Sequence, residues 1–126
     1  MILKKRIIIS TLMAIAACSE CLSQTISHIR ESSGYYILYD ASGHKYREIS
    51  NTDTELVGYS STLFVLSDNK GYFRIYDSRG ERVSLVSKGK VGRIVRVTDD
   101  GFICENSGYL YMYDIKSKSY KVISRA

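Results

Sequence analysis

Five side chains of the 126-residue sequence belong to the types that most often act as nucleophiles, proton carriers or metal ligands, namely three cysteines and two histidines. Cys18 and Cys21 have the spacing of a redox pair, but they lie at the edge of a predicted targeting segment and precede no strand-to-helix turn. Cys104 stands alone in a predicted strand, where a cysteine without a recognisable histidine partner is expected to be a small buried hydrophobe. His28 and His44 give little support to a metal site or a catalytic base. The sequence therefore predicts a protein that is not an enzyme and has no metal or cofactor.

Tyrosine is the most abundant side chain with a capacity for binding, since the chain has 11 tyrosines and no tryptophan. A tyrosine ring stacks on sugars or contacts a protein partner at a low entropic cost. The alternative, which we favour, is that the rings pack between neighbouring sheets, because tyrosine is an ordinary strand residue. The candidates are Tyr35, Tyr39, Tyr72, Tyr76, Tyr109, Tyr111 and Tyr113.

Positive charge is concentrated between residues 79 and 96, a segment that contains six basic residues and only one acidic residue, Glu81. Such a run could form a patch for an acidic protein, an anionic glycan or a lipid headgroup. A solvated loop is the alternative that we favour, because the run lacks interleaved aromatic residues. The six residues are Arg79, Arg82, Lys88, Lys90, Arg93 and Arg96.

Three aspartates recur at equal spacing, at Asp40, Asp77 and Asp114, 37 residues apart. Their carboxylates could suggest acid–base or calcium chemistry. The equal spacing favours a structural role instead, in which each carboxylate accepts a backbone N–H within a tight turn. Neither Asp68-Asn69 nor Asp99-Asp100 has the alternating oxygen ligands of a calcium loop.

The first 23 residues have the layout of a signal peptide. A basic start at Lys4–Arg6 precedes an uncharged, mostly apolar run of 11 residues, 7–17, and small residues follow. That run is too short to span a membrane, which takes about 20 apolar residues. Ile15–Cys18 resembles a lipobox, with Cys18 as the lipidated residue, whereas cleavage after Ser23 would release a soluble product; both remain open. We therefore expect export to the periplasm, the outer membrane or the outside, with membrane contact only through a lipid anchor and no nucleic-acid partner.

The rest of the chain is a threefold internal repeat. A shift of 37 residues aligns the segments that begin at Ile29, Leu66 and Ile103 without a gap. Chance similarity rarely produces such a match. Five positions are identical in all three copies: Gly34/Gly71/Gly108, Tyr35/Tyr72/Tyr109, Tyr39/Tyr76/Tyr113, Asp40/Asp77/Asp114 and Ser50/Ser87/Ser124.

Each copy is predicted to consist of short strands joined by tight turns, in an all-β domain without helices. Gly34, Gly71 and Gly108 supply the positive φ of a three-to-five-residue hairpin loop. Alternation along the next strand places Tyr36/Phe73/Leu110 and Leu38/Ile75/Met112 on a buried face. Two further strands are expected between copies, at 55–59 and 93–97. We assign residues 24–126 to one domain, with copies at about 27–61, 62–100 and 101–126.

These copies resemble the blades of a β-propeller of the NHL or YVTN kind: a strand, a glycine-turned hairpin, a strand that ends in Tyr-Asp, a short turn and a last strand. The resemblance implies three antiparallel blades, of which the first lacks a clear inner strand. Propellers close with four to eight blades, so three would form a half-propeller that stays open or is completed by homodimerisation into a six-bladed ring. Another threefold β architecture, such as a trefoil, is the alternative.

Repeat folds offer broad surfaces without chemistry of their own. We therefore expect an exported, non-enzymatic binding module of a Gram-negative bacterium, with a protein or a glycan as partner. A periplasmic immunity protein or inhibitor of a toxin or hydrolase is a second hypothesis, supported by the asymmetric basic half. A carbohydrate-binding protein that uses the tyrosines is a third.

Overall fold

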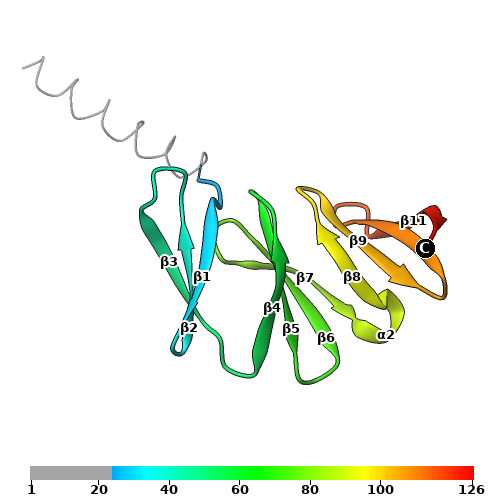
Figure 1. The fold of residues 1–126 in the computed structure, drawn as a ribbon, viewed down its shortest axis with the longest axis horizontal. Helices are drawn as coiled ribbons and strands as arrows, with labels where there is room; N and C mark the ends of the chain where they lie inside the picture. Colours follow the sequence, from blue (N-terminus) through cyan, green and yellow to red (C-terminus); the bar gives the residue numbers. More distant parts are fainter. Residues whose placement is uncertain (1–23) are drawn as a thin grey trace, which may run out of the picture.

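The computed structural model describes residues 24–126, and these residues form three antiparallel β-sheets that lie side by side in a row (Figure 1). The predicted signal peptide, including the lipobox cysteine Cys18, lies outside the described residues. None of the three sheets closes on itself. The prediction of an all-β fold built from tandem antiparallel hairpin repeats is confirmed.

Sheet 1 has three strands, and sheets 2 and 3 have four strands each. Sheet 1 contains β1 (His28–Ser32), β2 (Tyr35–Tyr39) and β3 (Lys45–Ser50). Sheet 2 contains β4 (Thr54–Tyr59), β5 (Leu63–Asp68), β6 (Tyr72–Asp77) and β7 (Arg82–Ser87). Sheet 3 contains β8 (Arg93–Val97), β9 (Gly101–Asn106), β10 (Tyr109–Asp114) and β11 (Ser119–Arg125). In each sheet the strands pair in chain order.

The strands predicted between copies are present as β4 and β8, but each belongs to the sheet that follows it. β4 pairs with β5 across a three-residue turn, and β8 pairs with β9 in the same way. The sheets therefore divide the chain at 28–50, 54–87 and 93–125, which differs from the predicted copies at 27–61, 62–100 and 101–126. Within residues 24–126, sheet 1 has no strand that corresponds to β4 and β8.

The gapless alignment misplaces β5 of the middle copy by one residue, whereas β6 and β7 keep the predicted alignment. The first hairpin of sheets 1 and 3 has a two-residue loop, at 33–34 and 107–108, whereas the hairpin of sheet 2 has a three-residue loop at 69–71. As a result Val65, and not Leu66, occupies the place of Ile29 and Ile103. Each of these residues pairs with the fourth residue of the next strand, Leu38, Ile75 or Met112. A one-residue change of register moves a side chain to the other face, so the loop length decides which face of β5 each residue joins.

The middle sheet is buried on both faces, because a hydrophobic core lies on each side of it. Alternate residues of β5 serve the two cores, since Phe64 and Leu66 pack against sheet 1, and Leu63 and Val65 pack against sheet 3. All four are at most 4% exposed. Sheets 1 and 3 each contribute one face to these cores. Their other faces lie at the two ends of the row (Figure 1).

One short helix interrupts the β structure, contrary to the prediction of none. Helix α2 (Lys88–Val91) is a single turn between β7 and β8, with Val91 buried in the core between sheets 2 and 3. Gly92 ends it with a φ of 80°. Among residues 24–126, no helix has the length and apolar character needed to cross a membrane.

Candidate binding surface

The tyrosines separate into an exposed set and a packed set. Tyr35, Tyr72 and Tyr109 occupy equivalent positions, each at the start of the strand that follows a glycine turn, and are 48%, 41% and 38% exposed. They lie at the same end of the three sheets, because each sheet repeats the same hairpin in the same direction. We call these three residues the tyrosine row. Arg125 lies 5.9 Å from the ring centroid of Tyr109.

The second set of tyrosines packs inside the molecule, as the favoured interpretation predicts. Tyr76 stacks on Phe64 with ring centroids 4.9 Å apart, and Tyr113 stacks on Phe102 at the same distance. Tyr111 is half-buried against the core between sheets 2 and 3. The equivalent of Tyr76 and Tyr113 in sheet 1 is Tyr39, which is half-buried, and no sheet of residues 24–126 precedes sheet 1 to pack against it.

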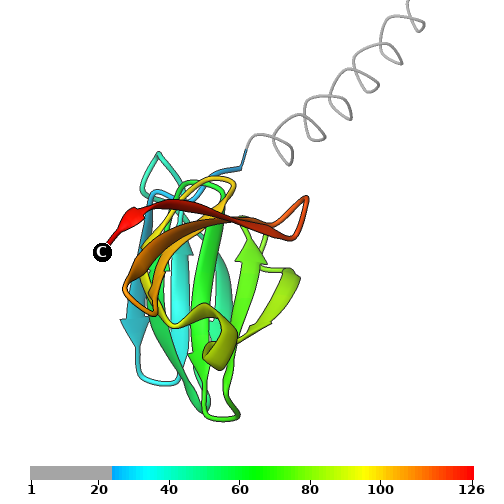
Figure 2. The same cartoon turned by 90° about the vertical axis from the view of Figure 1, so that its right-hand side faces the viewer.

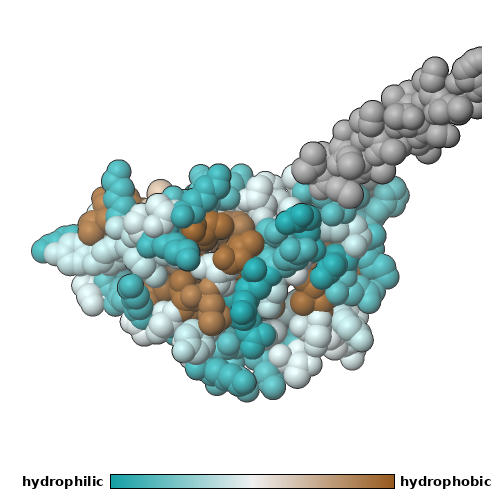
Figure 3. Space-filling model, turned by 180° about the vertical axis from the view of Figure 1, so that it is seen from behind, coloured by the Kyte–Doolittle hydropathy of each residue, from teal (hydrophilic) through white to brown (hydrophobic). Residues whose placement is uncertain are grey.

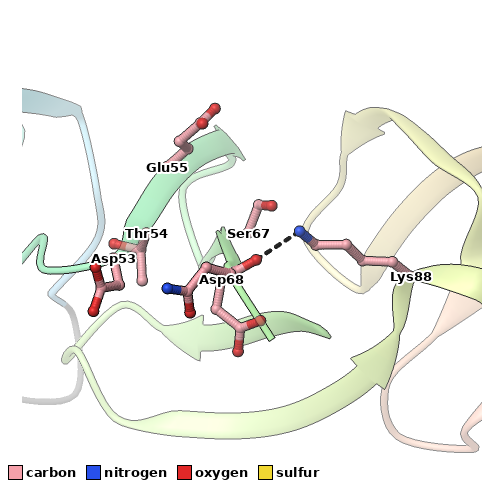
Figure 4. A pocket seen from close by; sticks show the side chains of 7 residues that line it. Asp53, Thr54, Glu55, Ser67, Asp68 and Lys88 are labelled. Atoms are coloured by element: carbon pink, nitrogen blue, oxygen red, sulfur yellow. Dashed lines mark hydrogen bonds between the residues drawn. The ribbon is translucent and has the colours of Figure 1, made fainter. Parts of the chain in front are cut away.

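The tyrosine row lies at the end of the sheets that also carries a cleft with a volume of about 450 Å³. Figure 4 shows polar side chains from β4, β5 and the start of α2 around it. The lining residues are Asp53, Thr54, Glu55, Ser67, Asp68, Asn69 and Lys88.

Asp68 is a buried polar residue in the lining of this cleft, and only 5% of it is exposed. Its Oδ1 accepts hydrogen bonds of 2.9 Å from the backbone N–H groups of Lys70 and Tyr72, and its Oδ2 accepts a 3.1 Å bond from Arg74 Nε. Burial alone would raise the pKa of the Asp68 carboxyl, but these donors outweigh it and hold the pKa below its ordinary value. Asp68 therefore fixes the turn that presents Tyr72.

Lys88 closes one side of the cleft. Its Nζ donates a 2.6 Å hydrogen bond to the backbone oxygen of Asp68 and lies 5.7 Å from the centroid of the Phe73 ring (Figure 4). Lys90, on the same helical turn, lies 5.5 Å from the Tyr120 ring centroid. Both ammonium groups thus lie against sheet residues. Besides Lys88 and Asn69, the side chains that line the cleft carry hydroxyl or carboxylate groups.

The basic residues predicted as one patch are separated in space. Arg79 lies in the β6–β7 turn, at the opposite end of sheet 2 from Lys88, and pairs with Asp77 at 3.2 Å. Arg93 pairs with Glu105. Arg82 and Arg96 lie on different sheets, on β7 and β8. A run in the sequence that passes from one end of a sheet to the other cannot form a continuous surface.

The three repeated aspartates lie where a strand meets a turn, since Asp40 directly follows β2 and Asp77 and Asp114 end β6 and β10. Asp77 Oδ1 accepts bonds of 2.9 and 3.0 Å from the backbone N–H groups of Arg79 and Glu81. Asp40 does the same for Ser42 and His44. Asp114 instead accepts from Ser117, in a four-residue loop, 115–118, that contains no glycine.

The cysteine and the histidines lie in different parts of the fold. Cys104 is 1% exposed in the core between sheets 2 and 3, where burial raises the pKa of its thiol. His28 is exposed on sheet 1, with Nδ1 3.3 Å from the Tyr59 hydroxyl oxygen. His44 lies in the Asp40 turn. Within residues 24–126, no group of three or more His, Cys, Asp or Glu side chains is arranged to hold a metal ion.

Sequence reasoning missed the cleft and the role of Asp68, which it weighed only as a calcium ligand. A signal was present in Asp68-Asn-Lys-Gly71, because an aspartate at the start of a glycine turn commonly accepts backbone N–H groups. The lining of the cleft depends on the meeting of β4, β5 and α2, which no local pattern describes.

Comparisons with known proteins identify no relative of this chain: no family model, no curated protein and no solved structure matches it.

Proposed function

We propose that the protein is an exported, non-enzymatic binding module that meets its partner with the tyrosine row. The observation that supports this proposal is the exposure of Tyr35, Tyr72 and Tyr109 at equivalent positions of three sheets, beside a polar cleft. Aromatic side chains at a surface provide large contact areas at a low entropic cost, and tyrosine is enriched in binding sites for this reason. The partner that we favour is a protein of the bacterial envelope.

The rigid placement of the row favours binding further. Tyr72 follows a turn that is held by the buried Asp68, through the 2.9 Å bond from its own backbone N–H. Each tyrosine also lies on a central strand that is paired on both sides. The conformational entropy that these tyrosines lose when a partner binds should therefore be small.

The row is tested by comparing two triple variants of residues 24–126 as bait in cross-linked extracts of a Gram-negative cell envelope. One variant carries Tyr35→Ser, Tyr72→Ser and Tyr109→Ser. The matched control carries Val83→Ser, Val95→Ser and Val122→Ser, which are also exposed apolar side chains. We expect a protein that the wild type and the control retain and the tyrosine variant loses by about tenfold or more. Equal retention by the two triple variants would refute the proposal.

A glycan is the second candidate, because hydroxyl and carboxylate groups line the cleft beside the row. A glycan array probed with the same three proteins distinguishes it from a protein partner. Binding by the wild type and the control, but not by the tyrosine variant, would assign the row to carbohydrate.

A further inference from the structure

The two ends of the row of sheets differ from its interior, because each end has a face without a neighbour. We call the face that a sheet turns toward the following sheet its back face, and the face toward the preceding sheet its front face. Figure 2 looks onto sheet 3 from the end of the row, and no other element of residues 24–126 lies in front of it. Within residues 24–126, no sheet lies against the back face of sheet 3 or the front face of sheet 1 (Figure 1), and we call these two faces open, although Ile37 on the front face of sheet 1 is only 7% exposed.

The open back face of sheet 3 carries apolar residues at positions that are buried in the other two sheets. Met112 is 44% exposed, whereas its equivalents Leu38 and Ile75 are 0% exposed in the two cores. Leu110 is half-buried, whereas its equivalents Tyr36 and Phe73 are buried. The same apolar back face is thus present in all three sheets, but a following sheet packs against it only in sheets 1 and 2.

The outer strand of sheet 3 extends this surface. Ile123 is 47% exposed and forms the bulge opposite Leu110. Its equivalents Ile49 and Val86 each pack against the core of their own interface. Figure 3, seen from behind, shows apolar patches mostly over the side of the molecule that carries sheets 2 and 3.

The open front face of sheet 1 carries the matching positions. In sheet 2, Phe64 pairs across the strands with Tyr76, and in sheet 3 Phe102 pairs with Tyr113. Each phenylalanine joins a core that also contains the middle apolar residue of the preceding sheet, Leu38 or Ile75 respectively. In sheet 1 the same pair is His28 and Tyr39, with ring centroids 6.0 Å apart and His28 exposed.

We propose that a second copy of this chain covers the back face of sheet 3 with the front face of its own sheet 1. Met112 of one copy then packs against His28 and Tyr39 of the other, as Leu38 packs with Phe64 and Tyr76 inside one chain. The contact is head-to-tail and continues the two interfaces that the chain already contains. This inference does not depend on the tyrosine row, because Tyr72 and Tyr109 stay exposed although a sheet covers their face.

An exception in the repeat agrees with this partner. Gly58 of β4 lies opposite Val65, and a Cβ atom there would lie 3.2 Å from Cγ2 of Val97 on the next inner strand. The equivalent residue of sheet 3, opposite Ile103, is Arg96. The arginine side chain fits at this position only if the next sheet has no strand equivalent to β8, because such a strand would occupy the same space. Among the described residues, sheet 1 is the sheet without this strand, so sheet 1 of a second copy fits beside Arg96.

Two copies then close a ring of six sheets. A head-to-tail contact either closes or grows into a filament. Rings of radially arranged four-stranded sheets typically have four to eight members, and six is the multiple of three in that range. Two identical contacts close the ring, which leaves no open sheet face, and place six tyrosines at one end.

The test is the solution mass of residues 24–126, measured by light scattering after size exclusion over a range of concentrations. We expect twice the mass of one chain. Met112→Asp and His28→Asp should each weaken the dimer by about tenfold or more, since each places a carboxylate in both contacts. Val83→Asp, which changes a 45% exposed residue outside both open faces, is the matched control and should leave the mass unchanged. Circular dichroism verifies that each variant is folded.

Mixing the two variants distinguishes head-to-tail contact from other arrangements. A mixed pair of Met112→Asp and His28→Asp has one doubly altered contact and one wild-type contact, so the mixture should form more dimer than either variant forms alone at the same concentration. His28→Phe, which introduces the residue found in sheets 2 and 3, should tighten the dimer. A wild type that is monomeric at all concentrations, a dimer that Met112→Asp weakens and His28→Asp does not, or assemblies larger than two copies would overturn the proposal.

Discussion

At the scale of single residues, aspartates that accept the same backbone hydrogen bonds differ in their surroundings. Asp68 is a buried carboxylate with three donors, whereas Asp40 and Asp77 cap turns nearer the surface. Cys104 is a core side chain rather than a reactive one. The residue type sets the capping role of these aspartates, whereas burial and the ion pair with Arg74 distinguish Asp68.

The ionised form of Asp68 should stabilise the fold at neutral pH. Asp68→Asn removes the ion pair with Arg74, and we expect a loss of about 1–3 kcal/mol in the free energy of unfolding at pH 7. The folded protein lowers the pKa of Asp68, so its contribution is complete above the unfolded value, near 4, and declines as the pH falls through the lower folded value. Urea unfolding from pH 7 to pH 2 should show the difference between wild type and variant shrinking.

Asp40→Asn is the matched control, because an asparagine oxygen can still accept from Ser42 and His44, and Asp40 has no ion pair among the described residues. Its cost should be smaller than that of Asp68→Asn. A difference for Asp68→Asn that stays constant down to pH 2 would contradict the role of the charge.

Cys104 should be unreactive while the protein is folded, because it is 1% exposed and burial raises the pKa of its thiol. In residues 24–126 it is the sole cysteine. We expect an aromatic disulfide reagent to label it at least about a hundredfold more slowly in buffer than in urea. Rapid labelling of the folded protein would contradict its place in the core.

At the scale of elements, loop length and glycine placement set the register of each sheet. Gly34, Gly71 and Gly108 have φ values of 88°, 94° and 84°, as the sequence predicts. The middle loop is one residue longer, which shifts β5 and places Val65 where the alignment predicts Leu66. The glycines were readable from the sequence, whereas the register depends on the strand pairing of the folded sheet.

Gly71→Ala should lower the free energy of unfolding by about 1–2 kcal/mol, because an L-residue is strained at a φ of 94°. The space around Gly71 is open, so strain rather than collision would cause the loss. Gly89→Ala is the control, since Gly89 lies in α2 without a positive φ and a Cβ there would meet only an ordinary contact at 3.7 Å. Urea denaturation of both variants measures the difference, and equal stabilities would contradict the strain.

At the scale of the whole molecule, the middle sheet couples the two cores. Because β5 contributes alternate residues to both, neither core can form without it. We therefore expect the chain to unfold in one cooperative transition. The sheets at the two ends of the row have one open face each.

Ile29→Val, in the core between sheets 1 and 2, and Ile75→Val, in the core between sheets 2 and 3, test this coupling. Each should destabilise the protein by about 0.5–1.5 kcal/mol and shift the same transition. Val122→Ala, at a 55% exposed position, should change stability by no more than about 0.5 kcal/mol. Tyrosine fluorescence and circular dichroism should coincide; two separate transitions would show that the cores unfold independently.

The sequence by itself determined the local structure of this protein. The 37-residue repeat, the strand positions, the glycine turns and the alternation of apolar residues predicted an all-β repeat fold, because each depends on residues close together in the chain. The predicted burial of Leu38 and Ile75 followed from the same alternation. The resemblance to propeller blades and the signal peptide remain predictions.

The tertiary structure alone decided which repeated positions are covered. Met112 has the same pattern as Leu38 and Ile75 but is 44% exposed, because no sheet of the described chain follows it. The tyrosines separate in the same way, since Tyr76 and Tyr113 face a neighbouring sheet near its core and Tyr72 and Tyr109 lie near its end. A repeat specifies which face of a strand is apolar, whereas burial depends on whether another sheet packs against that face.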